Sequence, residues 1–344
     1  MGAHGEEVLV EVRLKVRRYD PESGKGDYWD QYEVDVPEYA TVLDSLIEVR
    51  EYHDGSLGLR CSCRSAICGS CAMTVNGRAR LACNTKAKDM MLMGDTIVVE
   101  PGGNLPVIKD LVVDMQPHWQ KFRQVEPYLQ PSGPAPEREY LVNPAAMIDL
   151  NQVMGCIQCG ACVMACTSLE VDPNFIGPAA LAKAYRFTGD PRDTADKHRF
   201  ELYNQKGGVW DCTHCFYCVE VCPKGVAPMD QIMRIRAQMV EGGVKNSAGH
   251  RHEDTFTHSV KTSGRLNEAT MVPKSLGLMN PANMAEIPGA LRLAKTGKLM
   301  SAFKEGFFHR IPSAKSMRSI VNRVINGPKV VATTFPRKGE RKEE

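Results

Sequence analysis

The sequence contains no long apolar run and no marked excess of charge. Its apolar stretches fall far short of the roughly eighteen residues that a membrane-spanning helix requires, so we expect no transmembrane segment. The 43 basic and 41 acidic residues leave a net charge of +2, which argues against nucleic acid as a partner. No signal peptide precedes the first motif, and we therefore expect a cytoplasmic protein.

Cysteine, in contrast, is abundant, with 13 residues in a chain of 344. Twelve of them fall into three spaced sets. The first set reads C-x4-C-x2-C with a fourth cysteine further on, which is the plant-type spacing for a [2Fe-2S] cluster. Its predicted ligands are Cys63, Cys68, Cys71 and Cys83.

The other two sets both read C-x2-C-x2-C-x3-C, and Pro223 follows the second. This is the bacterial ferredoxin run, in which the fourth cysteine ligates the other cluster. We therefore predict two [4Fe-4S] clusters. One is held by Cys156, Cys159, Cys162 and Cys222, and the other by Cys166, Cys212, Cys215 and Cys218.

Other uses of cysteine fit the pattern less well. Zinc takes four ligands without a crossed triple run, so structural zinc sites in a non-redox protein are the weaker hypothesis. Disulfides are disfavoured because the cysteine count is odd and a chain of this length can build a core without them.

The remaining patterns predict an α+β protein. Alternating apolar residues at 8–16 and 32–36, with further strands near 72–75 and 96–100, predict a β-grasp domain over 1–105. Prolines and glycines bound a helical connector at 106–140. Helical stretches at 145–153, 178–187 and 229–240 then predict a mostly α two-cluster domain over 141–243.

Residues 244–344 form a cysteine-free basic extension. From residue 290 onward there are 13 Lys or Arg, 4 Glu and no Asp. Such a segment is either a solvated face or a docking surface for an acidic partner or an anionic membrane. An apolar stripe is equally consistent with a helix packed on the body of the protein: Leu291, Leu293, Leu299, Phe303, Phe307 and Phe308.

The order of motifs resembles the iron-sulfur subunit of succinate dehydrogenase and fumarate reductase. The resemblance covers roughly residues 8 to 240 and rests on CSCRSAICGSCAMTVNGRARLAC, NLPVIKDLVVDM, CIQCGACVMAC, GPAALAKAYRF and CPKG. It implies an oxidoreductase subunit without substrate chemistry of its own. Such a subunit passes electrons between the FAD of a flavoprotein partner and a quinone-side partner. The [2Fe-2S] centre would neighbour the flavin, and the Cys166 set would lie farthest from it.

Two departures from that family matter. Ordinary members lack a cysteine at the position of Cys215 and hold a [3Fe-4S] cluster there, whereas Cys215 completes a [4Fe-4S] ligand set unless it turns away as a buried thiol. Ordinary members also carry tryptophans of the quinone pocket where this chain has Asp172 to Phe175. Trp210 and His214 are the remaining candidates for the quinone side, although either could serve in packing.

In both departures this chain resembles an unorthodox branch of the family. Its members pair with a cysteine-rich, heterodisulfide-reductase-like subunit instead of a haem-containing membrane anchor, and some are thiol-dependent fumarate reductases. The resemblance therefore implies either a quinone-linked complex at the cytoplasmic face of a membrane or a soluble thiol:fumarate reductase.

Overall fold

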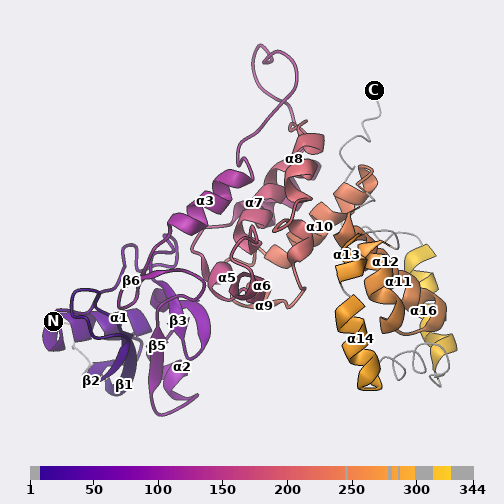
Figure 1. Ribbon diagram of the computed structural model, residues 1–344. Helices are drawn as coiled ribbons and strands as arrows, with labels where there is room; N and C mark the ends of the chain where they lie inside the picture. Colours follow the sequence, from indigo (N-terminus) through magenta and orange to yellow (C-terminus); the bar gives the residue numbers. More distant parts are fainter. Residues whose placement is uncertain (1–7, 245–246, 278–280, 286, 299–312, 327–344) are drawn as a thin grey trace. The chain divides into compact units, whose positions relative to one another are not determined.

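The computed structural model describes residues 8–244, 247–277, 281–285, 287–298 and 313–326 (Figure 1). The chain divides into two compact units, one formed by the chain up to Ile235 and the other by Arg236–Phe335. The first unit contains all thirteen cysteines. A finer division of this unit, at residues 105 and 140, stays a prediction.

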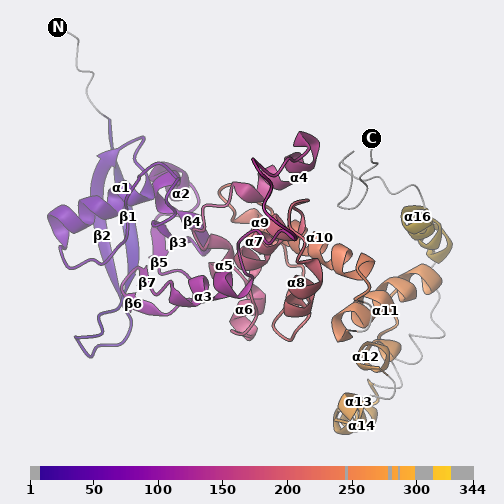
Figure 2. The same cartoon turned by 90° about the horizontal axis from the view of Figure 1, so that it is seen from above.

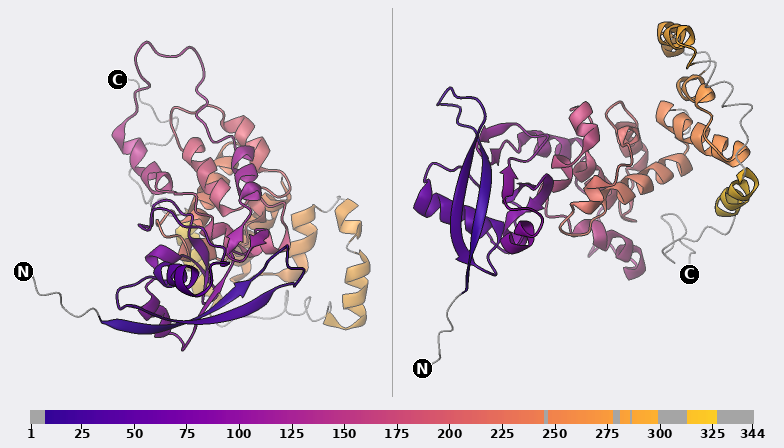
Figure 3. Two further views of the ribbon diagram at one scale, coloured as in Figure 1. Left: turned by 90° about the vertical axis from the view of Figure 1, so that its left-hand side faces the viewer. Right: turned by 90° about the horizontal axis from the view of Figure 1, so that it is seen from below.

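A five-stranded mixed sheet forms the first part of the cysteine-rich unit. Its strands lie in the order β2-β1-β5-β3-β4, with β1 parallel to β5 and every other pair antiparallel. They are β1 (Leu9–Arg18), β2 (Tyr28–Pro37), β3 (Ala72–Val75), β4 (Arg78–Leu81) and β5 (Ile97–Glu100). The long β1–β2 hairpin is seen from two sides in Figure 3. The sheet and the helices that follow confirm the predicted α+β class.

Local sequence signals account for these elements. Every second side chain from Val12 to Val16 is buried, as the alternation predicted. Thr41 caps helix α1 (Val42–Glu48) and forms a reciprocal capping box with Asp44. An Asn-Gly pair turns β3 into β4, where Gly77 has a φ of +72° that glycine adopts without strain. Helix α1 packs against β2.

The connector is helical only at Gln116–Gln124, and the prediction is wrong for residues 107–113, which form a hairpin, and for 125–140, which form neither helix nor strand. A short hairpin of β6 (Val107–Lys109) and β7 (Val112–Val113) precedes the helix α3 (Gln116–Gln124). The hairpin arises because its turn residue, Asp110, is anchored elsewhere in the fold.

Asp110 fastens this hairpin to the start of the first cysteine loop. Its buried carboxylate accepts hydrogen bonds from Arg18 Nε at 2.9 Å and from the backbone N–H of Gly58 at 2.7 Å. A third bond comes from the backbone N–H of Tyr19 at 3.0 Å. The buried guanidinium therefore ties β1, the hairpin and the loop together at a point a few residues before Cys63.

Helices make up the rest of the first unit, as predicted. They are α4 (Pro144–Met154), α5 (Ala161–Met164), α6 (Thr167–Val171), α7 (Pro178–Thr188), α8 (Asp196–Tyr203), α9 (Tyr217–Glu220) and α10 (Pro228–Glu241), the last of which continues into the second unit. The central helix α7 is buried along most of its length and contacts α3, α4 and α5. It carries small residues at the contacts, so the neighbouring helices approach closely.

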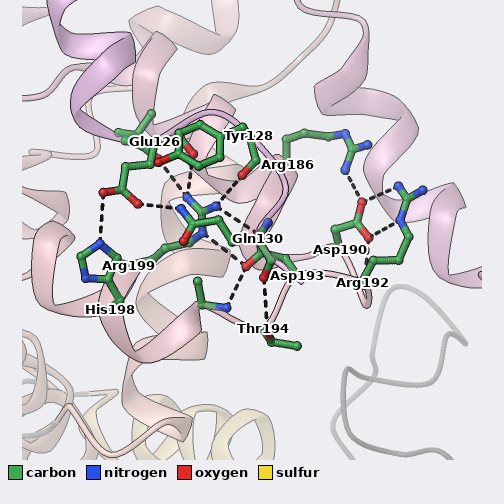
Figure 4. Close-up of polar contacts among 12 residues, drawn as sticks. Glu126, Tyr128, Gln130, Arg186, Asp190, Arg192, Asp193, Thr194, His198 and Arg199 are labelled. Carbon is green, nitrogen blue, oxygen red and sulfur yellow. Dashed lines mark hydrogen bonds and ion pairs between the residues drawn. The ribbon is translucent and has the colours of Figure 1, made fainter. Parts of the chain in front are cut away.

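A buried arginine holds the end of α3 in place (Figure 4). Arg199 of α8 donates to the backbone carbonyls of Val125, Glu126 and Tyr128 at 2.7 to 3.0 Å. Its charge is matched by Asp193 at 3.0 Å, and both side chains are fully buried. The guanidinium shares two of these carbonyls with other donors, since Tyr203 Oη also donates to Val125 and the N–H of Tyr128 to Glu126, and together these bonds fix the chain after α3.

The second unit is helical in its described parts. It contains α11 (Ala248–Ser263), α12 (Glu268–Leu276), α13 (Pro281–Ala285), α14 (Ile287–Lys295) and α16 (Ala314–Asn326). Helix α11 contacts both α12 and α16, with α13 and α14 following α12 (Figure 2). Leu291 and Leu293 of the predicted apolar stripe are exposed on α14, and the other four stripe residues lie outside the described residues.

Very little apolar surface is buried in this unit. Among the described residues after Glu241, Met271 is the one hydrophobic side chain that is buried, beside the polar side chains of Thr255, Ser259 and Ser275. None of the helices in the described ranges has the length and apolar character needed to cross a bilayer.

Candidate iron-sulfur centres

Three cysteines of the first set lie on the loop that leads into β3, and the fourth, Cys83, follows β4 in a short 3-10 turn. Backbone N–H groups of this loop point at Cys63 Sγ at 3.3 to 3.4 Å and come from Ser65, Ile67 and Cys68. The N–H of Ala66 points at Cys83 Sγ at 3.3 Å. The loop achieves this by adopting positive φ at Arg64, Ala66 and Gly69. Its backbone thus surrounds sulfur atoms with donors, as the walls of a cluster site do.

The thiols of this set differ in exposure. Cys68 is exposed, and its hydrogen bond with the Ser70 hydroxyl at 3.1 Å is the main cause that lowers its pKa to about 6. Burial raises the pKa of Cys71 to about 12, and Cys83 next to it is also buried. The set therefore has an inner side against the sheet and an outer side at the surface.

The second site is a small pocket that is partly open to solvent. The pocket is lined by the four cysteines that the crossed ferredoxin pattern grouped together: Cys156, Cys159, Cys162 and Cys222. Burial raises the pKa of Cys159 to about 11 and that of Cys162 well above its ordinary value. Cys222 reaches the pocket from the end of the other run, where the N–H of Val226 donates to its sulfur at 3.3 Å.

The third set also comes together. Burial, and then the neighbouring Cys212 and Cys215 thiols, raise the pKa of Cys166. Burial raises the pKa of Cys218 to about 12, with the same neighbours contributing. Cys215 is exposed, and Thr167 Oγ1 donates to its sulfur at 3.5 Å. Partial burial acts to raise the pKa of Cys215, but this and other hydrogen bonds outweigh burial and lower it.

The two ferredoxin runs repeat one backbone conformation. Gln158 and Gly160 have φ values of +57° and +79°, and the matching residues His214 and Phe216 have +58° and +66°. Each left-handed pair precedes a single-turn helix, α5 or α9, and these two helices contact each other. A left-handed conformation costs a residue other than glycine about 1 kcal/mol or more. Phe216 is thus held in a strained conformation at the surface.

The three sites adjoin one another within the first unit. Gly69 of the first loop lies so near Cys159 that a Cβ added to it would be 2.7 Å from the cysteine Cβ. Cys218 of the third set is among the thiols that raise the pKa of Cys162, after burial. The middle site is therefore flanked by the other two.

Three polar side chains that the sequence analysis missed hold these loops. Asn104 Nδ2 donates to the carbonyls of Val163 at 2.8 Å and of Cys166 at 2.9 Å, and so joins the end of the sheet region to the middle and third sites. Lys121 Nζ donates to the carbonyls of Pro173 and Phe175 at 2.6 and 2.5 Å.

The third of these side chains is His118. It is 2% exposed and hydrogen-bonds the backbone of Gln158, between two cysteines of the middle set. Its Nε2 has no partner in the described structure, and burial lowers its pKa to about 4. No single-sequence signal marks Asn104, His118 or Lys121, because their partners are backbone groups remote in the chain.

The two candidates for the quinone side differ in environment. Trp210 is half-buried, and its Nε1 donates to Asn204 Oδ1 at 2.8 Å. His214 lies within the third cysteine run and is half-buried. Phe175 is 1% exposed and belongs to the core. A quinone role for Trp210 or His214 stays a prediction.

The donor sets suit clusters better than single ions. Four sulfurs line a pocket at the middle site, and N–H groups face sulfur atoms at the first and middle sites. Soft thiolates together with N–H donors to sulfur are the environment that iron-sulfur clusters require.

Comparison with known proteins agrees with this chemistry. The model of a 2Fe-2S iron-sulfur cluster binding domain matches residues 13–120, and that of a 4Fe-4S dicluster domain matches residues 152–226. The chain is 39% identical to the fumarate reductase iron-sulfur subunit of Escherichia coli over 227 residues, covering 66% of this chain and 92% of that subunit. It is 37% identical to the succinate dehydrogenase iron-sulfur subunit of Coxiella burnetii over 233 residues, covering 67% and 97%.

Two further comparisons concern a longer sequence match and a solved structure. The 8-methylmenaquinol:fumarate reductase iron-sulfur subunit of Wolinella succinogenes is 31% identical over 297 residues, covering 84% of this chain and 91% of that subunit. This match is longer than the first unit and so extends into the second. A chain of the Mycobacterium smegmatis Sdh1 complex superposes with a TM-score of 0.63 at 26% identity, covering 70% of this chain and 99% of the other.

Proposed function

The chain belongs to the family of succinate dehydrogenase and fumarate reductase iron-sulfur subunits, and from that premise we propose that it carries electrons between the FAD of a flavoprotein subunit and a quinone-side partner. The observation that carries this proposal is the grouping of twelve cysteines into three adjoining sites. No acid, base or nucleophile of a substrate site is required of this subunit.

We assign the predicted ligand sets to these sites. Cys63, Cys68, Cys71 and Cys83 would hold a [2Fe-2S] cluster, and the pocket cysteines Cys156, Cys159, Cys162 and Cys222 would hold a [4Fe-4S] cluster. Cys166, Cys212, Cys215 and Cys218 would hold the second [4Fe-4S] cluster. When bound, such clusters supply reversible one-electron transfer. The protein supplies burial, N–H donors and close spacing, which tune the potentials and shorten the distance between sites.

The contacts between sites support the order that the family implies. The first and middle sites meet at Gly69 and Cys159, and the middle site also neighbours Cys218 of the third. Cys68 and Cys215 are the two exposed ligands, one in each outer set. We therefore place the flavoprotein beside Cys68 and the acceptor subunit beside Cys215.

The surface beside Cys215 fits a protein partner. Phe216 is 51% exposed in spite of its left-handed backbone, and Tyr217 next to it is 49% exposed. Strain of this kind persists where function requires it. Large exposed aromatic side chains are typical of interfaces.

A quinone-linked complex is the better supported of the two family alternatives. The relative from Wolinella succinogenes acts on a menaquinol by name, and its match includes part of the second unit. The test is fumarate reduction by the purified complex with a quinol or with a dithiol as donor. Activity with the dithiol alone would instead support a soluble thiol:fumarate reductase, and activity with neither would contradict both.

Cys215 decides the type of the third cluster. We expect Cys215→Ser to convert the third site from a [4Fe-4S] to a [3Fe-4S] centre, because a corner ligand is removed. The measurement is electron paramagnetic resonance of the oxidised protein, in which a [3Fe-4S] signal should appear in the variant only. A full-occupancy [3Fe-4S] signal in the unaltered protein would refute the role of Cys215.

A further inference from the structure

Two helices of the second unit expose apolar faces that no described residue covers. On α14, Ile287 and Leu291 are 48% and 58% exposed, and the helix has no buried residue. On α16, Met317, Ile320 and Val324 are 46%, 59% and 76% exposed. Residues spaced by three, four or seven positions lie on one face of a helix, so each set forms an apolar stripe.

The contact of α16 with its neighbour does not use this stripe. Ala314 of α16 lies against Gly264, which follows α11, and Arg318 donates to the carbonyl of Thr262 at 3.4 Å. The side of α16 that carries Met317, Ile320 and Val324 is directed elsewhere. Figures 1 and 2 show α16 on one side of α11, and α13 with α14 beyond α12 on the other.

The charges around both stripes have one sign. Residues 287–298 and 313–326 contain no Asp or Glu. They carry six basic residues: Arg292, Lys295, Lys298, Lys315, Arg318 and Arg323. An apolar stripe flanked by Lys and Arg on a helix of low net hydrophobicity is typical of helices that lie in the interface of a membrane.

We propose that α14 and α16 bind the surface of an anionic lipid bilayer and hold this subunit there directly. Leu291 and Ile320 would enter the boundary between headgroups and acyl chains, while basic residues outside the α11 contact, among them Arg292 and Arg323, would face anionic headgroups. An acidic protein surface would match the charge, but it would not by itself require two stripes of aliphatic side chains. The proposal deepens the quinone-linked function, because a quinone partner places the complex beside a membrane.

Sedimentation of the purified complex with lipid vesicles tests the proposal. We expect binding to phosphatidylglycerol vesicles and little binding to phosphatidylcholine vesicles, with salt weakening it. Leu291→Asp combined with Ile320→Asp should lower the partition coefficient at least tenfold. Arg292→Gln and Arg323→Gln should each lower it about fivefold, since one basic residue near an anionic surface contributes about 1 kcal/mol. The matched control is Leu92→Asp, which alters a leucine of the first unit that is 80% exposed.

A variant that gains a fluorescence signal on membrane binding distinguishes loss of binding from loss of folding. Leu291→Trp should be quenched by brominated lipid in anionic vesicles, in excess of the quenching seen for the native tryptophans. Equal binding to both lipids, unaltered binding by the Leu291 and Ile320 variant, or no excess quenching would overturn the proposal. The proposal would also be overturned if the Leu291 and Ile320 variant lost a partner subunit but still bound vesicles. That result would show that a protein surface covers the two stripes.

These measurements contain no redox step. Iron content and fumarate reduction are assayed separately, so failure of vesicle binding and failure of the proposed electron-transfer function give different results.

Discussion

The two units of this protein differ in how far they bury the apolar faces of their helices. In the first unit, α7 is surrounded and its side chains from Pro178 to Ala182 are buried. In the second unit, Met271 is the one hydrophobic side chain buried among the described residues after Glu241. A helix gains stability by burying its apolar stripe, at about 25 cal/mol per Å². The first unit buries such stripes internally, whereas in the described part of the second unit the stripes of α14 and α16 stay exposed.

The difference follows from the tasks of the two units. Thiolate ligands must be held at fixed spacing with backbone N–H groups directed at sulfur, and the cysteine loops include residues with positive φ such as Ala66, Gln158 and His214. An attachment surface must instead remain open until its partner arrives. Variants in either unit can test this difference.

Removal of the crossed ligand should damage the first unit most. We expect Cys222→Ser to lose the middle cluster, because no fifth cysteine lines the pocket to replace it. The iron content should fall from about ten to about six atoms per chain. Iron and acid-labile sulfide assays measure this. The control is Cys61→Ser, which alters the one cysteine outside the three sets and should leave both unchanged. Full iron content in Cys222→Ser would refute Cys222 as a ligand, and loss of the third cluster's electron paramagnetic resonance signal with the middle one retained would refute the crossed assignment.

Close packing between the first and middle sites can be tested at Gly69. Gly69→Ala adds a Cβ within 2.7 Å of Cys159 Cβ at a φ of +75°, so a cysteine of the middle site must move. Gly77→Ala is the matched control, because Gly77 has nearly the same φ of +72° but open space around it. We expect Gly77→Ala to cost about 1 kcal/mol. Gly69→Ala should cost more and should also slow reduction of the middle cluster in rapid-mixing experiments; equal effects would contradict the contact.

His118 makes the first unit sensitive to acid. Burial lowers its pKa to about 4 from an ordinary value of 6.5, so the unfolded chain takes up a proton before the folded chain does. The stabilisation is complete above pH 6.5 and is lost as the pH falls towards 4, by about 3 kcal/mol in total. We expect His118→Phe to flatten this dependence in anaerobic thermal melts from pH 7.5 to 4.5. Parallel curves for the two proteins would exclude His118 as the cause.

Removal of the second unit should have the smallest effect on the clusters. A chain ending after Gly243 should keep its iron content and its melting temperature within a few degrees, because the cysteines and nearly all of the buried apolar residues lie before that point. Iron assays and calorimetry on the two chains measure this. A large loss of either would show that the second unit supports the first.

Short-range features of the fold could be predicted, and long-range ones could not. The Thr41 capping box and the Asn76-Gly77 turn involve residues within three positions of each other, so local physics determines them. The hairpin at 107–113 was mistaken for helix because Asp110 is held by Arg18, some ninety residues earlier in the chain. A single sequence carries no sign of such a pair.

The candidate sites divide in the same way. Cysteines separated by two residues are within reach of a common cluster wherever the loop is placed, because the chain spans at most about 3.6 Å per residue. The sequence by itself therefore determined the spacing of the twelve cysteines that we predict as ligands, together with the family resemblance. It also determined that the basic residues gather near the C-terminus.

Only the tertiary structure decided how these parts meet. It placed Gly69 against Cys159, directed Asn104 and His118 to backbone groups of the cysteine loops, and left α14 and α16 with open apolar faces. Each of these results depends on which surfaces remain after the core has packed. Core packing depends on contacts between residues that are far apart in the chain, and the spacing of residues along a sequence does not indicate these contacts.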